Sequence, residues 1–341
     1  MSRPEKILAV QFKYLGDAVF ITPALRALKE RWPEAELHVL VAAEVAPLLE
    51  NIPWVKKIWA LPRTRGRARL RESWPLIRAL RKEKFPRAVD FGGNDRGAIL
   101  SFLIGAKIRL AAVDQKKILQ TICYTQIISA NTLSPVWVQR HLQLLSAWQV
   151  PPPKSTRLDI AADSALAAAA AKILPAGMIL CHLGTSQPRK EWPLADWQKF
   201  FHLAKAAGFS TAFSSGNNER ERSLLADFQK MEPEIYALPP VADLKLFLAV
   251  LQRARLVIAG DTGPLHFAAG LGVPVIGLFG TADSLLRSAP VYRPEQIIRG
   301  SECVCDANGL HSPNCAAART CMGAIAPAEV FTAMKKILTA Q

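Results

Sequence analysis

Four short stretches of the 341-residue chain combine glycine with side chains that bind or transfer charge. They are FKYLGDAVFITPAL (12–25), HLGTSQPRKEWP (182–193), RLVIAGDTGPLHFAAGLGVPVIGLFG (255–280) and SSGNNERE (214–221). Each contains or follows an apolar, strand-like run and leads into a helical pattern. Because open α/β sheets bind ligands at the carboxyl ends of their strands, we expect these stretches to form a site.

The first stretch places Gly16 and Asp17 between a strand-like run and a helix. Glycine lets the backbone come close to a ligand, which makes Gly16 a candidate contact to an acceptor substrate. Asp17 has two interpretations. It caps the following helix, or its carboxylate takes a proton from an acceptor hydroxyl as a catalytic base.

The second stretch brings Gly184, Thr185, Ser186 and Lys190 into one loop after a strand. Hydroxyl and amide donors together with an ammonium suit a phosphate group. The loop is not a Walker A loop, because the required Gly-Lys-Ser/Thr is absent. An ordinary polar loop is the alternative interpretation.

The third stretch starts a helix at Thr262 and Gly263, with Pro264 at its first position. The N–H groups of a first helical turn attract anions, so this turn favours a phosphate as well. Asp261 does not suit a phosphate. It orients a lysine or a ligand hydroxyl, or it caps the turn, whereas His266 taken alone is typical of a structural histidine.

The fourth stretch is again a connection from a strand to a helix, and it contains Glu219. A carboxylate at such a position commonly accepts hydrogen bonds from the two hydroxyls of a ribose. The alternative is a solvated first-turn glutamate that the helix dipole stabilises. The residue by itself favours that alternative.

The elements that must position these residues alternate between strands and helices along the chain, which predicts βαβ units and parallel sheets. The pattern breaks at VPPPKSTRLDI (150–160), where three consecutive prolines exclude a helix interior or a central strand. We therefore expect two Rossmann-like domains, residues 1–153 and 154–341, that face each other across a deep cleft.

The composition is that of a globular protein, and its charge suggests an anionic partner, which is nucleic acid, a membrane surface or an acidic small molecule. Half of the residues are hydrophobic and the formal net charge is +15. No apolar run reaches the length of a membrane span and no signal peptide precedes the first strand, so a cytoplasmic location is expected. Twelve Lys or Arg stand against two Glu between positions 56 and 87. This run forms a solvated basic face, or it binds an acidic ligand.

Taken together, the four stretches resemble the heptosyltransferases, the inverting glycosyltransferases of family 9 that add heptose to the inner core of lipopolysaccharide. The resemblance covers nearly the whole chain. It rests on GDAVFITPALRALKERWP, GTSQPRKEWP, GNNERE, GDTGPLHFAAGLGVPVIGLFG and the late CMGAI, in this order. It implies a GT-B fold, with the acceptor on the first domain and the nucleotide-sugar on the second.

The resemblance also implies a role for each candidate. Asp17 becomes the general base and Lys190 the cation on the donor diphosphate. The remaining donor-binding residues are Thr185, Ser186, Glu219, Asp261, Thr262, Gly263 and His266. The implied donor is ADP-heptose, and catalysis would need no metal or other cofactor.

The implied acceptor is an acidic, Kdo-containing lipid at the inner surface of the cytoplasmic membrane. Such an acceptor gives the basic run a partner, with Arg63, Arg65 and Arg67 as candidate contacts. A related enzyme that moves another sugar, or that glycosylates a protein or another glycan, is the nearest alternative. A non-catalytic basic module is an alternative of another class, but stacking aromatics are too sparse in the run to favour nucleic acid.

Four of the six cysteines, Cys303, Cys305, Cys315 and Cys321, lie within nineteen residues. Close-set cysteines in a cytoplasmic protein favour a metal over a disulfide, with zinc first and iron second. The spacing departs from paired Cys-x2-Cys motifs, so reduced thiols are the alternative. A metal held by four thiolates would be structural, because it keeps no open position.

Overall fold

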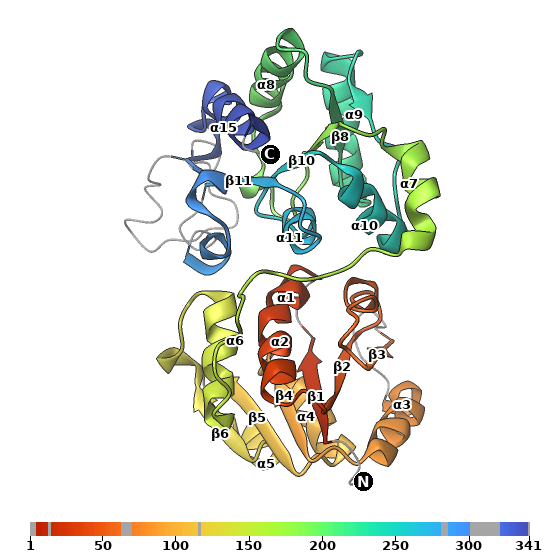
Figure 1. Ribbon diagram of the computed structural model, residues 1–341, viewed down its shortest axis with the longest axis vertical. Helices are drawn as coiled ribbons and strands as arrows, with labels where there is room; N and C mark the ends of the chain where they lie inside the picture. Colours follow the sequence, from red (N-terminus) through yellow and green to blue (C-terminus); the bar gives the residue numbers. More distant parts are fainter. Residues whose placement is uncertain are drawn as a thin grey trace. The chain divides into compact units, whose positions relative to one another are not determined.

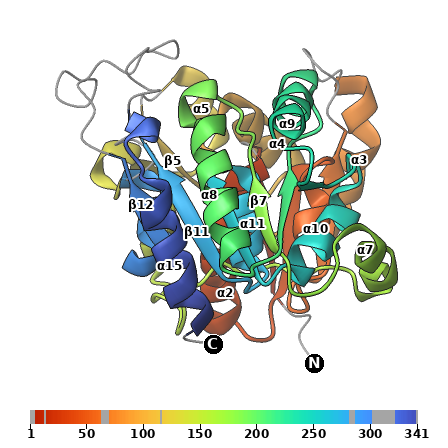
Figure 2. The ribbon, with the colours of Figure 1, turned by 90° about the horizontal axis from the view of Figure 1, so that it is seen from above.

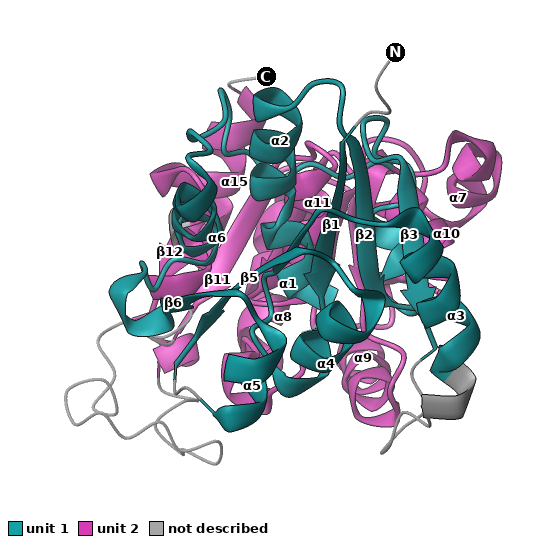
Figure 3. Cartoon of the chain, turned by 90° about the horizontal axis from the view of Figure 1, so that it is seen from below, with its two compact units in different colours: residues 1–161 teal, residues 162–341 magenta. Residues whose placement is uncertain are grey.

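The computed structural model describes residues 5–12, 15–62, 70–114, 117–280, 286–300 and 321–339. The chain divides into two compact units, residues 1–161 and 162–341 (Figures 1 and 3). Each unit contains one six-stranded sheet in which every strand pairing is parallel, with helices on both faces. This confirms the expected α/β class with two parallel sheets.

The sheet of the first unit has the order β3-β2-β1-β4-β5-β6. Its strands are β1 (Lys6–Gln11), β2 (Glu36–Ala42), β3 (Lys57–Leu61), β4 (Arg87–Asp90), β5 (Ile108–Val113) and β6 (Gln126–Ser129). The central strands are buried along almost their whole length, as expected for strands with helices on both faces.

The helices of the first unit form two layers. One layer holds α1 (Leu15–Phe20), α2 (Thr22–Arg31) and α6 (Trp137–Leu145), and the other holds α3 (Leu70–Glu83), α4 (Asp95–Ile104) and α5 (Ile118–Cys123) (Figure 3). Short 3-10 turns are η1 (Ala46–Leu48), η2 (Ala130–Thr132) and η3 (Ser146–Trp148). Strand order reverses between β1 and β4, which is where open sheets of this type have their crevice.

The sheet of the second unit repeats this topology with the order β12-β11-β10-β7-β8-β9. Its strands are β7 (Ile179–His182), β8 (Thr211–Ser214), β9 (Tyr236–Ala237), β10 (Leu256–Gly260), β11 (Val275–Phe279) and β12 (Ile297–Arg299). Here the order reverses between β10 and β7.

A hydrophobic core joins one face of this second sheet to α8 (Leu194–Ala206), α9 (Glu219–Met231) and α15 (Pro327–Thr339), as Figure 2 shows for α8 and α15. Trp197, Phe200, Phe213 and Phe228 are fully buried in it. The other helices are α7 (Ala167–Ile173), α10 (Leu244–Arg253) and α11 (Gly263–Gly270), and the 3-10 turns are η4 (Ser164–Leu166), η5 (Pro188–Lys190), η6 (Ala289–Val291) and η7 (Pro294–Gln296).

The segment after the three prolines belongs to the first unit, so the boundary falls eight residues later than position 153. Arg26 of α2 donates hydrogen bonds to the carbonyl oxygens of Ser155 and Arg157 and pairs with Asp159. The amide of Asp159 donates to the Thr22 hydroxyl at 3.0 Å. These bonds hold the extended segment against α2.

Two local expectations need correction. Gly16 and Asp17 do not lie in a loop, because the chain already forms the short helix α1 there. Asp17 is the third residue of that helix and does not occupy its N-cap position. In α11 the first helical residue is Gly263, so Pro264 is the second.

Candidate functional site

Three of the four glycine-containing stretches meet at the carboxyl edge of the second sheet. They follow β7, β8 and β10, and these strands are neighbours in the sheet order β10-β7-β8. Parallel strands end at the same edge, so the loops after them lie side by side although up to about eighty residues separate them along the chain. The strand order reverses between β10 and β7, so the crevice of the second sheet lies among these three loops.

The centre of this edge is a partly buried network of charged and polar side chains. Lys190 Nζ donates to Asp261 Oδ2 at 2.5 Å, and the two side chains are only 19% and 9% exposed. The other carboxylate oxygen of Asp261 lies 3.4 Å from His266 Nε2. His266 Nδ1 is in turn hydrogen-bonded to the Tyr292 hydroxyl, and the two rings stack.

This network keeps Asp261 ionised. Burial by itself would raise the pKa of the Asp261 carboxyl, but the hydrogen bond and charge of His266, and then those of Lys190, hold that pKa well below its usual value. Burial and the Asp261 charge raise the pKa of Tyr292, so its hydroxyl stays protonated. Asp261 thus orients a lysine, which is one of the roles the sequence allows for it.

Two features hold Lys190 in this place. A Cβ on Gly260 would lie 2.7 Å from the Lys190 carbonyl oxygen, so only glycine at the end of β10 lets the η5 turn come this close. Arg220 of α9 pairs with Glu191 at 2.6 Å and also donates to the Thr185 carbonyl. This arginine ties the start and the end of the loop together.

The hydroxyl residues of the same loop differ in what they offer a ligand. Thr185 is buried, and its hydroxyl donates to the Gln187 carbonyl at 2.6 Å, so it holds the loop in shape. Ser186 is exposed. The N-cap of α11 is Thr262, in extended conformation and with no capping hydrogen bond from its side chain. The positive end of α11 therefore adjoins the Lys190–Asp261 pair.

The fourth stretch contains two glutamates with different surroundings. Glu219, the ribose candidate, is the first residue of α9 and is exposed. Glu221 is buried and accepts a hydrogen bond from the Gly216 amide at 3.0 Å. Its carboxylate fills the space where a Cβ on Gly184 or Gly216 would stand, at 2.3 Å from each. It joins the loops after β7 and β8, a role that residue spacing does not reveal.

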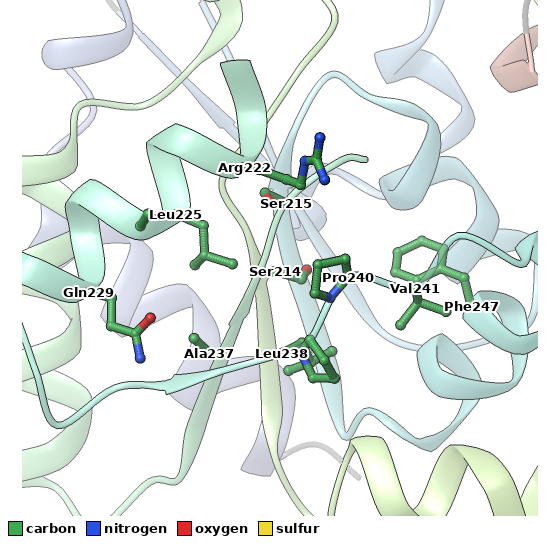
Figure 4. Close-up of a pocket in the computed structure, with 12 residues that line it drawn as sticks. Ser214, Ser215, Arg222, Leu225, Gln229, Ala237, Leu238, Pro240, Val241 and Phe247 are labelled. Atoms are coloured by element: carbon green, nitrogen blue, oxygen red, sulfur yellow. The ribbon is translucent and has the colours of Figure 1, made fainter. Parts of the chain in front are cut away.

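A pocket of about 380 Å³ lies beside these loops in the second unit (Figure 4). It is lined by Ser214, Ser215, Arg222, Leu225, Ala226, Gln229, Ala237, Leu238, Pro239, Pro240, Val241 and Phe247. Ser214, at its floor, is hydrogen-bonded at 3.0 Å to His182, a residue whose pKa burial lowers to about 4. Sequence reasoning missed this pocket, because its wall between Leu238 and Val241 comes from a proline-containing segment without charged groups.

The first unit presents a separate polar edge. Gly16 and Asp17 are partly exposed at the start of α1, just after β1. At the end of the neighbouring β4, Asp90 is buried and accepts hydrogen bonds from the Gly92 amide at 2.8 Å and the Tyr124 hydroxyl at 2.6 Å. Asp90 holds the turn that follows β4, and sequence reasoning did not single it out.

Several candidates lie outside the described residues: Arg63, Arg65, Arg67, Cys303, Cys305 and Cys315. The fourth cysteine of the cluster, Cys321, is buried, as are Cys123 and Cys181. Within the described ranges there is no group of His, Cys, Asp or Glu that would hold a metal. In the same ranges, no helix has the length and apolar character that crossing a bilayer requires.

The chemistry of the second unit follows from this geometry. A partly buried ammonium and the start of a helix converge where three loops meet, which suits a diphosphate that gains charge when a bond to it breaks. A carboxylate fixes the ammonium in place. The adjoining pocket has mostly apolar walls and a few polar groups, the usual composition of a site for a flat organic ring.

Comparisons with known proteins identify the family. The profile of glycosyltransferase family 9 (heptosyltransferase) matches residues 73–308. Lipopolysaccharide heptosyltransferase 3 of Escherichia coli is 22% identical over 289 residues, which cover 80% of this chain and 83% of that protein.

Two solved structures share the fold. A family 9 glycosyl transferase of Veillonella parvula has a TM-score of 0.80 at 18% identity, and the match covers 100% of this chain and 99% of that one. The E. coli ADP-heptose lps heptosyltransferase II has a TM-score of 0.77 at 18% identity, covering 98% and 99%. With the paired parallel sheets these matches confirm the GT-B class. The chain belongs to glycosyltransferase family 9, the heptosyltransferase family, and is a glycosyltransferase.

Proposed function

We propose that the protein transfers heptose from ADP-heptose, with inversion, to an acidic, Kdo-containing acceptor of the lipopolysaccharide core. The observation that carries this proposal is the partly buried Lys190–Asp261 pair beside the start of α11. The names of the relatives point to the same donor and the same product class.

The reaction is a single displacement at the anomeric carbon. Asp17 removes the proton of the acceptor hydroxyl while the new glycosidic bond forms and the bond to ADP breaks. Negative charge then develops on the ADP diphosphate. Lys190 and the backbone N–H groups of the turn at Thr262 and Gly263 stabilise that charge, so the reaction needs no metal for this purpose.

The rest of the donor fits the neighbouring features. The adenine ring occupies the pocket of Figure 4, between the Pro240–Val241 segment and Leu225. Glu219, exposed at the start of α9, accepts hydrogen bonds from the ribose hydroxyls. Ser186 adds a hydroxyl at the phosphates, and His266 keeps Asp261 in position.

The acceptor binds the first unit, where Asp17 lies. Gly16 allows it to approach closely, and the Arg63, Arg65 and Arg67 side chains neutralise its carboxylates and phosphates. We expect the enzyme to work in the cytoplasm at the inner face of the cytoplasmic membrane, where a lipid-linked acceptor would be.

Binding and transfer test the proposal separately. ADP should raise the melting temperature, and UDP or GDP at the same concentration should raise it less, because adenine is the base proposed for the pocket. A mass-spectrometric screen of nucleotide-sugars with a Kdo-lipid acceptor should then show a heptose added from ADP-heptose. Transfer of another sugar, or to a protein or a different glycan, would replace the substrate assignment. If ADP has no effect on the melting temperature, a non-catalytic basic module is the alternative that remains.

The four late cysteines carry a separate proposal, a structural zinc or iron site. Cys321 is buried next to the core of the second unit, and a Cβ on Gly280 would contact it, so a metal here would fix the chain before α15. Elemental analysis of protein purified without chelator or metal resin should find about one equivalent. Less than about 0.2 equivalents, with all four thiols titrating freely, would contradict the metal.

A further inference from the structure

The short helix α5 in the first unit turns its apolar side chains outward. Ile118 is 83% exposed, Ile122 61% and Leu119 38%. Gln120 and Cys123, on the opposite side of the helix, are buried. A helix on a globular surface normally buries its apolar stripe, so this reversed arrangement leaves hydrophobic surface in need of a partner.

The apolar surface continues onto α4 and has a basic border. Phe102 of α4 is 47% exposed, and the Arg109 guanidinium lies 5.6 Å from its ring. Arg109 also donates to the Cys123 carbonyl at the end of α5, so Phe102 and the end of α5 flank the same cation. Lys117 stands at the N-cap of α5. The α4–α5 patch is Phe102, Ile118, Leu119 and Ile122, bordered by Lys117 and Arg109.

The charge of the protein is concentrated in the unit that carries this patch. Residues 1–161 contain 26 Lys or Arg against 13 Asp or Glu, a net charge of +13. Residues 162–341 contain 17 against 15, a net charge of +2. The first unit is therefore attracted to an anionic surface, and it is repelled by a second copy of itself.

The patch also begins at the edge of the first sheet where the acceptor is expected. Lys117 pairs with Asp95 at the start of α4, at 3.2 Å. Gln120 of α5 donates to the Gly93 carbonyl, in the turn that follows β4, at 3.4 Å. The start of α5 thus lies at the carboxyl edge of the first sheet, the edge at which Asp17 follows β1.

We propose that the α4–α5 patch docks the protein onto an anionic lipid bilayer. Ile118 and Ile122 enter the boundary between headgroups and acyl chains, while Lys117 and Arg109 contact lipid phosphates. This proposal rests on the proposed function, since a lipid-linked acceptor must reach Asp17 from a membrane. Docking through this patch brings the acceptor edge of the first unit to the bilayer.

Vesicle co-sedimentation tests the docking surface. The wild type is compared with the double variant Ile118→Ser/Ile122→Ser, which removes apolar contact without adding charge. Met231→Ser, at an exposed methionine of the second unit, is the matched control. On vesicles of phosphatidylethanolamine and phosphatidylglycerol, the double variant should bind about tenfold more weakly and Met231→Ser like the wild type. All three proteins should bind phosphatidylcholine vesicles poorly.

Each result decides between clear alternatives. Equal binding of wild type and double variant, or no binding by the wild type, would overturn the docking surface. The docking surface would also be overturned if the wild type sedimented as a dimer and the double variant as a monomer. Stabilisation by ADP, measured on the same samples, shows that the variants fold. If ADP fails to stabilise the wild type while vesicle binding still depends on Ile118 and Ile122, the proposed function fails and the docking surface stands.

Discussion

The two units share one topology but use charge in opposite ways. The second unit has nearly balanced charge and holds its key ions, Lys190 and Asp261, in a partly buried ion pair. The first unit carries most of the positive charge of the chain, and Asp17 is partly exposed. A fixed ion pair prepares one position for a constant small ligand, whereas a basic surface attracts a large anionic one. This contrast matches a donor half and an acceptor half.

The strongest test of the contrast is Asp17→Asn. Loss of the base should lower the transfer rate at least about a hundredfold, the usual minimum for general base catalysis. ADP affinity should not change, because the residues proposed to bind the donor all lie in the second unit. Initial rates and calorimetry on one preparation check both statements. A variant with a near wild-type rate would remove Asp17 from the mechanism.

The next largest effect is expected for Lys190→Ala. In the proposed mechanism the ammonium contacts the diphosphate before and during bond breaking, so ADP should bind more weakly and kcat should fall by a factor of about 10²–10³. Lys199→Ala, at an exposed lysine on α8, is the control of equal charge. Unchanged ADP affinity in calorimetry would place Lys190 outside the donor site.

A change at Asp261 separates positioning from binding. Asp261→Asn keeps the ammonium but frees it from its buried partner, so ADP should still bind while kcat falls by a smaller factor, about tenfold. Comparison of the kcat and KM of this variant with those of Lys190→Ala checks that the Asp261 variant loses less. Equal losses in the two variants would mean that Asp261 contacts the ligand itself.

The last prediction concerns stability and its dependence on pH rather than transfer. The pKa of His182 is about 4 in the folded protein, against about 6.5 in an unfolded chain. The unfolded state therefore takes up a proton first as pH falls, and the free energy of unfolding should drop by up to about 3 kcal/mol between pH 6.5 and 4.

Replacement of that histidine makes the pH effect testable. Denaturant titrations of His182→Gln should show a shallower dependence below pH 6.5, with the remaining slope partly from His38, whose pKa burial also lowers. Above pH 7 the two curves should run parallel. Identical slopes on both sides would assign the acid sensitivity to other groups.

The sequence by itself determined the local features of this protein. Apolar runs predicted most of the strands and helical periodicity predicted most of the helices, because burial of alternating or striped side chains depends on near neighbours. The sequence also placed Lys190 and Asp261 in loops that follow strands. The short helices α1 and α5, the longer helices α4 and α6, and the strands β6, β9 and β12 were not predicted.

Only the tertiary structure decided which of these residues meet. Lys190 and Asp261 are 71 residues apart, and they pair because β7 and β10 are neighbours in the sheet, an order that no local pattern encodes. Glu219 and Glu221 belong to the same stretch, yet Glu221 alone is buried, because two glycines on different loops leave room for its carboxylate. The environment of a side chain depends on distant segments, and these come together only when the chain folds.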